Sequence, residues 1–215
     1  MATTMTFDSL QADVRRYLER GSVTDTLVYE QLPSLINNAE RRIATELKVQ
    51  GFINVLTFNL AEGQAVYDKP DRWRKTVSMT YGGGASNESR TPVFARSYEY
   101  TQAYWPDRTQ RAAPEFYADY DYSHWVIVPT PDAAYPIEVL VDRLPALLDD
   151  TNQTNWITDF APQLLLYATL LETAPFIKDD ERIAVWQNMY DRAAGMINGE
   201  DVAKILDRAA TRKEA

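Results

Sequence analysis

The sequence lacks cysteine altogether and contains one histidine among its 215 residues. Without cysteine it can form no disulfide, no thiolate metal site and no thiol nucleophile, which fits a reducing compartment. Positive charge is scarce too, because 22 Lys and Arg face 31 Asp and Glu and leave a formal charge of −9. Since nucleic-acid binding draws most of its strength from Lys and Arg, this balance argues against a protein that grips DNA.

Long apolar runs are also missing. The run LLLYATLL at residues 164–171 is only eight residues long, whereas a membrane-crossing helix needs roughly 20. The stretch MATTMTFDSLQADVRRYLERG has no basic start followed by an apolar segment, so we expect no secretory signal. The block TNWITDFAPQLLLYATLLETAPFIKDDE at residues 154–181 instead predicts a buried helix, apolar on nearly every side, which neighbouring helices or subunits must cover.

The N-terminal part of the chain is predicted to be helical. Residues 6–48 carry two apolar stripes at helical spacing. Pro33 is expected in the first turn of the second helix, where its missing N–H has no partner to lose. The stripes consist of Phe7, Leu10, Val14, Tyr17 and Leu18, and of Leu32, Leu35, Ile36, Ala39, Ile43 and Leu47.

The middle of the chain has strand periodicity. From Phe52 to about Arg143 the apolar period is two, in short stretches such as INVLTFNL, KTVSMTY, EFYADY, HWVIVP and IEVLVD. These stretches are rich in Val, Ile, Thr and aromatics and are separated by Gly or Pro. They predict a sheet, antiparallel because the connections are short.

Helical spacing returns after Asp150. We expect the apolar helix to start near Thr158 or Asp159, with Pro162 in its first turn and Pro175 bending or ending it. A following helix should be interrupted at Gly199, before a short last helix. Its apolar stripe is formed by Ile183, Trp186, Tyr190, Ala193 and Ile197.

These patterns predict an α+β fold. A helical bundle from the N- and C-terminal segments carries an inserted antiparallel β-rich domain, because two N-terminal helices alone cannot surround the apolar helix. The expected parts are residues 1–50 and 151–198 for the bundle, 51–150 for the insertion, and a tail at 199–215.

The sequence offers little catalytic chemistry. His124 is the single histidine, and with strand residues on either side it is expected to be structural. Asp119 and Asp121 could coordinate a cation, but alternation favours a solvated face. Asp149 and Asp150 are typical of turns and caps, although paired carboxylates in a cleft could act as acid and base. We therefore predict no enzyme activity, no cofactor, no metal and no catalytic residue.

Two segments are candidates for contacts. Gly82, Gly83 and Gly84 are not followed by Lys-Ser/Thr or a helix pattern, so they predict a hairpin tip that could become ordered against a neighbour, not a phosphate loop. The aromatic segments ARSYEYTQAYWPDR and PEFYADYDYSHW favour sheet core plus a short helix. The alternative for these segments is a recognition surface for a sugar or a protein.

Four strings carry a resemblance to a known family. They are LPSLINNAERRIATEL, YDKPDRWRKTVSM, PEFYADYDYSHWVIVPTPDAAYPIEVLVDRLPALLDDTNQTNWI and APQLLLYATLLETAPFIKDDE, and they cover most of residues 32–181. In these strings the sequence resembles the head-to-tail adaptor, or connector, proteins of tailed bacteriophages, the group that includes tail tubular protein A. The strings consist of folding residues and contain no catalytic signature.

The resemblance implies a structural virion protein, made in the host cytoplasm and placed at the head–tail junction. Adaptors of this kind have a helical bundle with an inserted β-rich domain and form a ring, usually dodecameric, beneath the portal protein. The ring continues the DNA channel, and tail or nozzle proteins dock on it. No membrane is implied, and an acidic channel would let DNA pass without specific binding.

The contact residues follow as expectations. The last stretch, GEDVAKILDRAATRKEA, combines an apolar stripe with basic residues and is expected to bind the portal. Its expected portal contacts are Val202, Ile205, Leu206, Arg208, Arg212 and Lys213. The expected subunit or tail contacts are Gly82, Gly83, Gly84, Tyr98, Tyr100 and Trp105.

Two other functions remain open from the sequence. A carbohydrate-binding or carbohydrate-cleaving module would expose aromatic rings in a groove, with two carboxyl groups roughly 5–9 Å apart if it is a hydrolase. The rings concerned are those of Trp105, Tyr117, Tyr120, Tyr122 and Trp125. A different virion component with the same architecture, such as a tail completion protein, is the third possibility.

Overall fold

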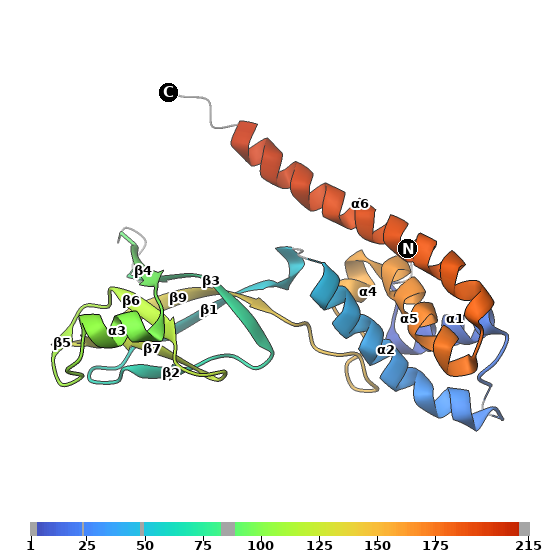
Figure 1. The fold of residues 1–215 in the computed structure, drawn as a ribbon, viewed down its shortest axis with the longest axis horizontal. Helices are drawn as coiled ribbons and strands as arrows, with labels where there is room; N and C mark the ends of the chain where they lie inside the picture. The colour runs from blue at the N-terminus through green and yellow to red at the C-terminus, as the bar shows by residue number, and fades with distance from the viewer. Residues whose placement is uncertain (1–3, 23, 48–49, 83–88, 211–215) are drawn as a thin grey trace. The chain divides into compact units, whose positions relative to one another are not determined.

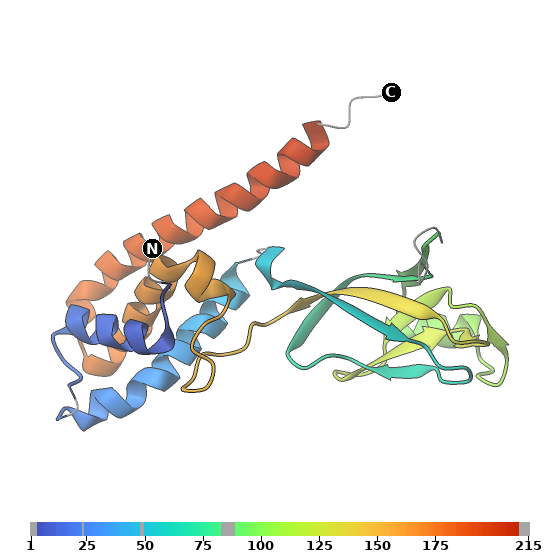
Figure 2. The ribbon, with the colours of Figure 1, turned by 180° about the vertical axis from the view of Figure 1, so that it is seen from behind.

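The chain forms two compact units (Figures 1 and 2). The computed structural model describes the backbone of residues 4–22, 24–47, 50–82 and 89–210, and their side chains apart from 50, 180 and 200–210. Residues up to Phe52 and from Pro145 onward make the helical unit, and Ile53–Leu144 make the sheet unit. Among the described residues, no helix combines the length and the apolar character that crossing a bilayer requires.

The helical unit is built from both ends of the chain, as the α+β prediction required. Its N-terminal elements are α1 (Phe7–Leu18), α2 (Thr26–Glu46) and the short 3₁₀ turn η1 (Gln50–Phe52). Its C-terminal elements are α4 (Trp156–Phe160), α5 (Pro162–Ile177), the 3₁₀ turn η2 (Asp180–Arg182) and α6 (Ile183–Ala210). The fold class predicted from the sequence is confirmed.

The apolar helix α5 lies at the centre of this unit. Its packing partners α1, α2, α4 and α6 all come from the same chain. As the sequence predicted, α5 has almost no polar face. The four helices around it keep its apolar side chains away from water. The buried residues of α5 are Leu164, Leu165, Leu166, Ala168, Thr169, Leu170, Leu171, Thr173 and Ala174.

The expected start of this helix near Thr158 is wrong. Two helices meet at Ala161, whose φ of −136° and ψ of 45° are not helical. The ring of Pro162 disfavours the α conformation at the preceding residue, so the chain breaks there and Pro162 becomes the first residue of α5. Asn155 caps α4 by accepting from the N–H groups of Ile157 (3.0 Å) and Thr158 (3.3 Å).

Pro33 is also placed differently from the prediction. It lies inside α2, about two turns beyond the start at Thr26. A proline inside a helix costs about 3 kcal/mol. Val28 and Leu32 are buried, and burial of such side chains contributes about 1.5–3 kcal/mol each, so packing extends the helix across the proline.

Gly199 does not interrupt the last helix. α6 continues through it for 28 residues, because one glycine in a helix costs only about 1 kcal/mol and good helix formers follow it. The predicted stripe is confirmed over the first half of α6. Tyr190 is buried there, and Ile183, Trp186, Ala193 and Ile197 are half-buried.

The sheet unit holds a seven-stranded curled sheet in the order β1-β9-β3-β4-β6-β7-β2, and a two-stranded ladder of β5 with β8. Its elements are β1 (Ile53–Asn59), β2 (Val66–Asp68), β3 (Trp73–Tyr81), β4 (Thr91–Ala95), α3 (Tyr98–Tyr104), β5 (Arg111–Ala112), β6 (Phe116–Asp119), β7 (His124–Val128), β8 (Thr130–Pro131) and β9 (Pro136–Arg143). The inner face forms one core around Trp125, whose indole N–H donates to Thr76 Oγ1 (2.9 Å).

The sheet is mixed, so the antiparallel prediction is wrong for two ladders. β4 pairs in parallel with β6, and β5 pairs in parallel with β8. Parallel neighbours need a crossover connection, and for β4 and β6 the segment containing α3 supplies it. The other ladders are antiparallel as predicted.

A buried carboxyl fastens the segment by which the chain returns to the helical unit. Glu40 of α2 is 1% exposed. Its Oε2 accepts from the N–H of Leu148 (3.0 Å), and its Oε1 accepts from the amide of Asn155 (2.5 Å). Burial raises the pKa of Glu40 to about 7, although both hydrogen bonds favour the carboxylate and lower it.

This buried carboxyl predicts a pH dependence. The folded-state pKa of Glu40, about 7, lies above its ordinary value of 4.5. Between pH 4.5 and about 7 the folded protein therefore holds a proton on Glu40 that the unfolded chain has released. The free energy of unfolding falls as the pH rises through this interval. Glu40→Gln removes this titration. Between pH 5 and 8 the free energy of unfolding of Glu40→Gln, relative to wild type, should rise by about 2–3 kcal/mol.

Urea unfolding at several pH values measures this difference. Asp150→Asn, at an exposed carboxyl of the same connecting segment, is the matched control and should run parallel to wild type. A constant difference between Glu40→Gln and wild type across this range would contradict the assignment.

Candidate functional site

The short helix α3 is fixed to the outer side of the sheet. Ser97 caps it by accepting from the N–H of Tyr100 (3.3 Å). Tyr98 and Trp105 are half-buried and pack on a small cluster of Ala118, Val126 and Val128 from β6 and β7. This anchoring settles which side chains of α3 face outward.

The outward side of α3 forms an exposed aromatic surface. Tyr100 and Tyr104 are 43% and 44% exposed, and their rings are 9° from parallel with centroids 6.0 Å apart. Phe116 meets both rings edge-on, at 5.7 and 5.0 Å. Phe94 lies opposite Phe116 in the β4–β6 ladder and is 55% exposed. We call Phe94, Tyr100, Tyr104 and Phe116 the α3 aromatic surface.

A cation completes this surface. The guanidinium of Arg96 lies 5.6 Å from the ring centroid of Tyr100 and 5.3 Å from that of Phe116. Aromatic residues and arginine are enriched in the cores of protein interfaces, where they supply large contact areas at low entropic cost. The α3 aromatic surface has the composition that is typical of such interface cores.

The structure places the predicted subunit or tail contacts in different positions. Tyr100 lies on the α3 aromatic surface, whereas Tyr98 and Trp105 hold α3 on the sheet. Gly82 directly follows β3 and has a φ of +90°, a conformation that favours glycine. Gly83 and Gly84 lie outside the described residues.

Sequence reasoning missed the other members of this surface. Tyr104 could have been found, because it follows Tyr100 by one helical turn. Phe94 and Phe116 could not, because only the parallel pairing of β4 with β6 brings them together.

The aromatic residues proposed for a carbohydrate site do not form one surface. Trp125 is 0% exposed and Tyr117 is 7% exposed, and both belong to the core of the sheet unit. Tyr120 and Tyr122 are exposed, but buried Trp125 and Tyr117 cannot stack on a sugar beside them. The expected sheet core is therefore confirmed for Tyr117 and Trp125 and the expected short helix for α3, whereas Tyr100, Tyr104, Tyr120 and Tyr122 are exposed.

His124 takes part in a surface charge cluster. Its Nδ1 lies 2.8 Å from Asp121, and its Nε2 lies 3.2 Å from Asp68. The hydrogen bond with His124 lowers the pKa of Asp121. These contacts tie the turn between β6 and β7 to β2. Among the described residues, no group of three or more His, Asp or Glu is placed to hold a metal ion.

Lys69 holds the same turn from inside. Its ammonium pairs with Asp119 (2.8 Å), donates to the carbonyl of Asp121 (2.8 Å), and lies 3.7 Å from the ring centroid of Trp73. The carboxylate of Asp119 therefore pairs with Lys69, and the carboxylate of Asp121 pairs with His124.

Asp149 is a turn residue, as the sequence indicated. Its Oδ1 accepts from the N–H and hydroxyl of Thr151 (2.7 and 2.6 Å) and from the N–H of Asn152 (2.8 Å). These hydrogen bonds lower the pKa of Asp149, so its carboxylate stabilises the chain reversal before α4.

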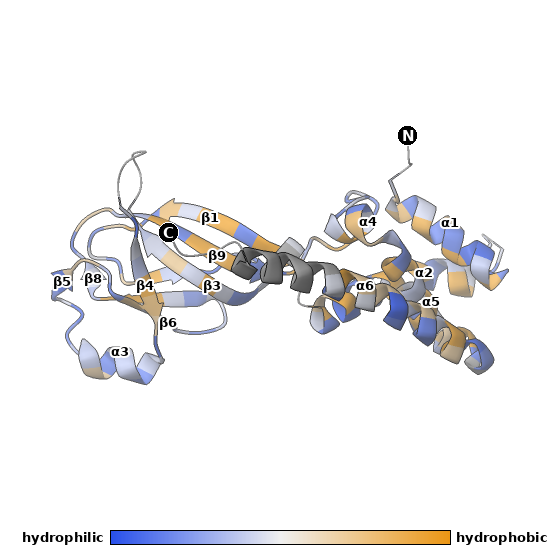
Figure 3. Cartoon of the chain, turned by 90° about the horizontal axis from the view of Figure 1, so that it is seen from above, coloured by the Kyte–Doolittle hydropathy of each residue, from blue (hydrophilic) through white to orange (hydrophobic). Residues whose placement is uncertain are grey.

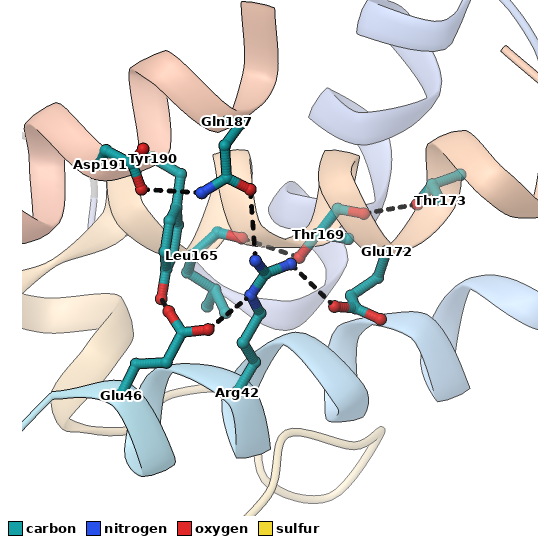
Figure 4. A network of polar contacts seen from close by, with 9 residues as sticks. All are labelled: Arg42, Glu46, Leu165, Thr169, Glu172, Thr173, Gln187, Tyr190 and Asp191. Carbon is teal, nitrogen blue, oxygen red and sulfur yellow. Dashed lines mark hydrogen bonds and ion pairs between the residues drawn. The ribbon is translucent and has the colours of Figure 1, made fainter. Parts of the chain in front are cut away.

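A polar network fastens the first half of α6 (Figure 4). Arg42 of α2 pairs with Glu46 (3.0 Å) and with Glu172 of α5 (3.3 Å), and it donates to the amide oxygen of Gln187 of α6 (3.3 Å). The hydroxyl of Tyr190 donates to Glu46 (2.5 Å), and the guanidinium lies 5.1 Å from the centre of the tyrosine ring. We call these five residues the α6 clamp.

Beyond the α6 clamp, the helix passes the end of α5. Ala193, Met196 and Ile197 line a groove together with Pro162 and Leu164 from the first turn of α5, so the two helices run antiparallel. At 1.5 Å per residue α6 is about 42 Å long and α5 about 24 Å. The last part of α6 therefore extends past α5.

The predicted portal contacts fall in this last part or beyond it. Val202, Ile205, Leu206 and Arg208 belong to the helical backbone of α6, and their side chains lie outside the described residues. Arg212 and Lys213 also lie outside the described residues.

The surface position of His124 gives a testable prediction. His124→Ala should change the free energy of unfolding by no more than about 1 kcal/mol, because exposed ion pairs contribute little. Purified protein should not turn over glycan or nucleotide substrates, since no nucleophile and base are paired in the described residues around His124. Thermal unfolding and substrate assays measure both outcomes.

Trp125→Ala removes a buried side chain from the sheet core and is the positive control. It should lower the free energy of unfolding by about 3–5 kcal/mol. Turnover that disappears with His124→Ala at full stability would overturn the structural assignment.

Residues 5–212 match a family model described as SU10 adaptor protein. No curated protein matches the chain.

Proposed function

Because the chain belongs to the SU10 adaptor protein family, a family of phage head-to-tail adaptors, we propose that it forms a ring beneath the portal of a virion. The ring, of about twelve copies in line with the resemblance, continues the DNA channel and carries a tail or nozzle protein. The observation that carries this proposal is the family match over residues 5–212, which spans both units.

The charge balance supports the channel. DNA moving through a ring should not be retained by it, and retention depends on Lys and Arg. A formal charge of −9 provides an excess of carboxylates, which repel phosphates at the range of a Debye length. No specific DNA contact, no membrane contact and no enzymatic activity form part of this proposal.

The α3 aromatic surface supports a protein contact below or beside each copy. A closed ring joins two different faces of neighbouring subunits, and the tail needs a third. Tyr100 and Tyr104 are exposed and stacked on each other, and the cation of Arg96 lies 5.6 Å from the ring centroid of Tyr100. These properties are typical of the residues that dominate binding energy. We assign this surface to the neighbouring copy or to the tail protein.

Portal docking is assigned to the end of α6. The α6 clamp and the packing on α5 hold the helix up to Ile197, so we assign the part of the helix after Ile197 to another protein. On a helical wheel the apolar stripe of the last part is turned by roughly 130° from the stripe that packs on α5. A stripe turned this far from its own bundle needs a different partner. Its members are Val202, Ile205, Leu206 and Ala209.

The basic residues of the tail complete this assignment. From Arg208 onward the sequence has three basic residues, Arg208, Arg212 and Lys213, and one acidic residue. In an acidic protein, such a local excess favours acidic groups on the partner. We propose Ile205 and Leu206 as the anchors and the three basic residues as their charged rim.

Removing the tail tests portal docking. A chain without residues 199–215 should lose portal binding, because the proposed anchors are gone. Its thermal unfolding should stay nearly unchanged, because the stripe that packs on α5 ends at Ile197. Binding to purified portal and calorimetry on the truncated chain measure the two effects.

Point variants make the test sharper. Leu206→Asp should weaken portal binding by at least about tenfold, as loss of a buried anchor does. Lys204→Asp, on the side of the same helix opposite the stripe, is the control and should bind normally. Full portal affinity of the truncated chain would exclude the tail as the docking element.

The ring itself is tested by mass. Free protein should be monomeric or only weakly associated at low micromolar concentration, and it should form the ring when purified portal is added. Native mass spectrometry with and without portal gives both answers. A stable closed ring without portal would show that self-association does not depend on the portal.

A further inference from the structure

The strand β1 is an open edge of the curled sheet. It pairs with β9 on one side, and no other strand lies beside it among the described residues. Figure 3 shows hydrophobic segments along this strand. Val55 is 58% exposed although it is apolar. Such an edge presents a row of main-chain N–H and C=O groups to whatever approaches it.

The register identifies which groups face outward. The N–H of Leu60 donates to the carbonyl of Tyr135 (2.8 Å), in line with the β1–β9 ladder. Hydrogen-bonded pairs alternate along an antiparallel ladder. Asn54, Leu56 and Phe58 therefore bond to β9, and the main-chain groups of Ile53, Val55, Thr57 and Asn59 point away from it.

Within the described strand itself, β1 has none of the features that usually protect an edge. Exposed edges are normally blocked by charged residues, by proline, by a bulge or by shortness. β1 has seven residues, INVLTFN, without charge, proline or glycine. Its ladder with β9 runs through all seven residues without a register shift. The opposite edge, β2, has only three residues and carries exposed Asp68.

We propose that β1 pairs with β1 of a second copy of this chain, in antiparallel register centred on Leu56. The outward main-chain N–H and C=O groups of one copy must bond to the outward groups of the other. Val55 therefore faces Thr57 of the second copy, and Ile53 faces Asn59. This register pairs all seven residues, and any register shifted by one pair leaves residues without a partner.

The side chains fit this pairing. Leu56 is half-buried at the margin of the sheet core, and in this register it lies directly opposite Leu56 of the second copy. On the other face, β-branched Val55 and Thr57 become neighbours, a combination that stabilises sheets. Because β1 carries no charge, the two copies bring no like charges together. The exposed edge is thus complementary to itself.

The contact is twofold and differs from the ring contact, which joins two different faces. The β1–β1 contact therefore forms a weak, reversible dimer of the free protein. This dimer does not depend on the portal. The experiment uses the full-length chain without portal, so its result is independent of whether a ring forms.

The absence of cysteine allows a clean crosslinking test. Val55→Cys and Thr57→Cys proteins are mixed and oxidised. Facing Cα atoms in such a pair lie about 5.5 Å apart, within the roughly 4.4–6.8 Å that a disulfide spans. The mixed disulfide should form at least about tenfold faster than dimers of Val77→Cys, because pairing raises the effective concentration.

Val77 is the matched control, since it is exposed but belongs to the interior strand β3. Leu56→Cys should form a disulfide with itself, because its Cα atoms face each other at about 4.5 Å. Val55→Cys alone should crosslink more slowly than the mixture. Faster crosslinking of Val55→Cys alone would indicate a shifted register and overturn the one proposed.

A backbone change separates edge pairing from chance collision. Thr57→Pro removes an outward N–H and no bond to β9, and proline is tolerated on edge strands. In the Leu56→Cys chain it should abolish crosslinking at nearly unchanged thermal stability, whereas Thr57→Val should not. Equal crosslinking in the mixture and in Val77→Cys, or crosslinking that survives Thr57→Pro, would refute the pairing.

Discussion

The burial of α5 is the constraint on which the rest of the structure depends. A helix without a polar face must be surrounded, and the chain surrounds it with α1 and α2 from one end and α4 and α6 from the other. The sheet unit then has to be an insertion. The α6 clamp draws on the same arrangement, because Arg42 reaches Glu172 on α5 and Gln187 on α6 only when the three helices lie together.

Periodicity made most of this fold predictable. The apolar stripes of α1, α2 and the first half of α6 face the core as the sequence indicated, except for Tyr17, which is 44% exposed, and the lone apolar block became the central helix. The errors lie where local signals compete with packing. Pro162 broke a helix that was expected to continue, whereas Pro33 and Gly199 failed to break theirs. Around Pro33 the burial of apolar side chains outweighed the free-energy cost of proline in a helix. Around Gly199 the helix-forming residues that follow outweighed the smaller cost of glycine.

The candidate site was less predictable than the fold. Its aromatic composition was visible, and so were the structural role of His124, the solvated face of Asp119 and Asp121, and the turn at Asp149. The α3 aromatic surface was not, because it depends on a parallel ladder between β4 and β6. Pairing between distant segments leaves no mark in the period of either segment. The division between anchoring and exposed tyrosines on α3 depends on that ladder as well.

The core around α5 is built from both ends of the chain, and this has a consequence for synthesis. A ribosome releases α1 and α2 first, then the sheet unit, and only afterwards α5. The sheet unit contains its whole core within residues 53–144, so it can fold while translation continues. The apolar faces of α1 and α2 must wait through that interval without their partner. The nascent chain therefore exposes them until α5 emerges, and a chaperone that shields apolar helices would act in that interval.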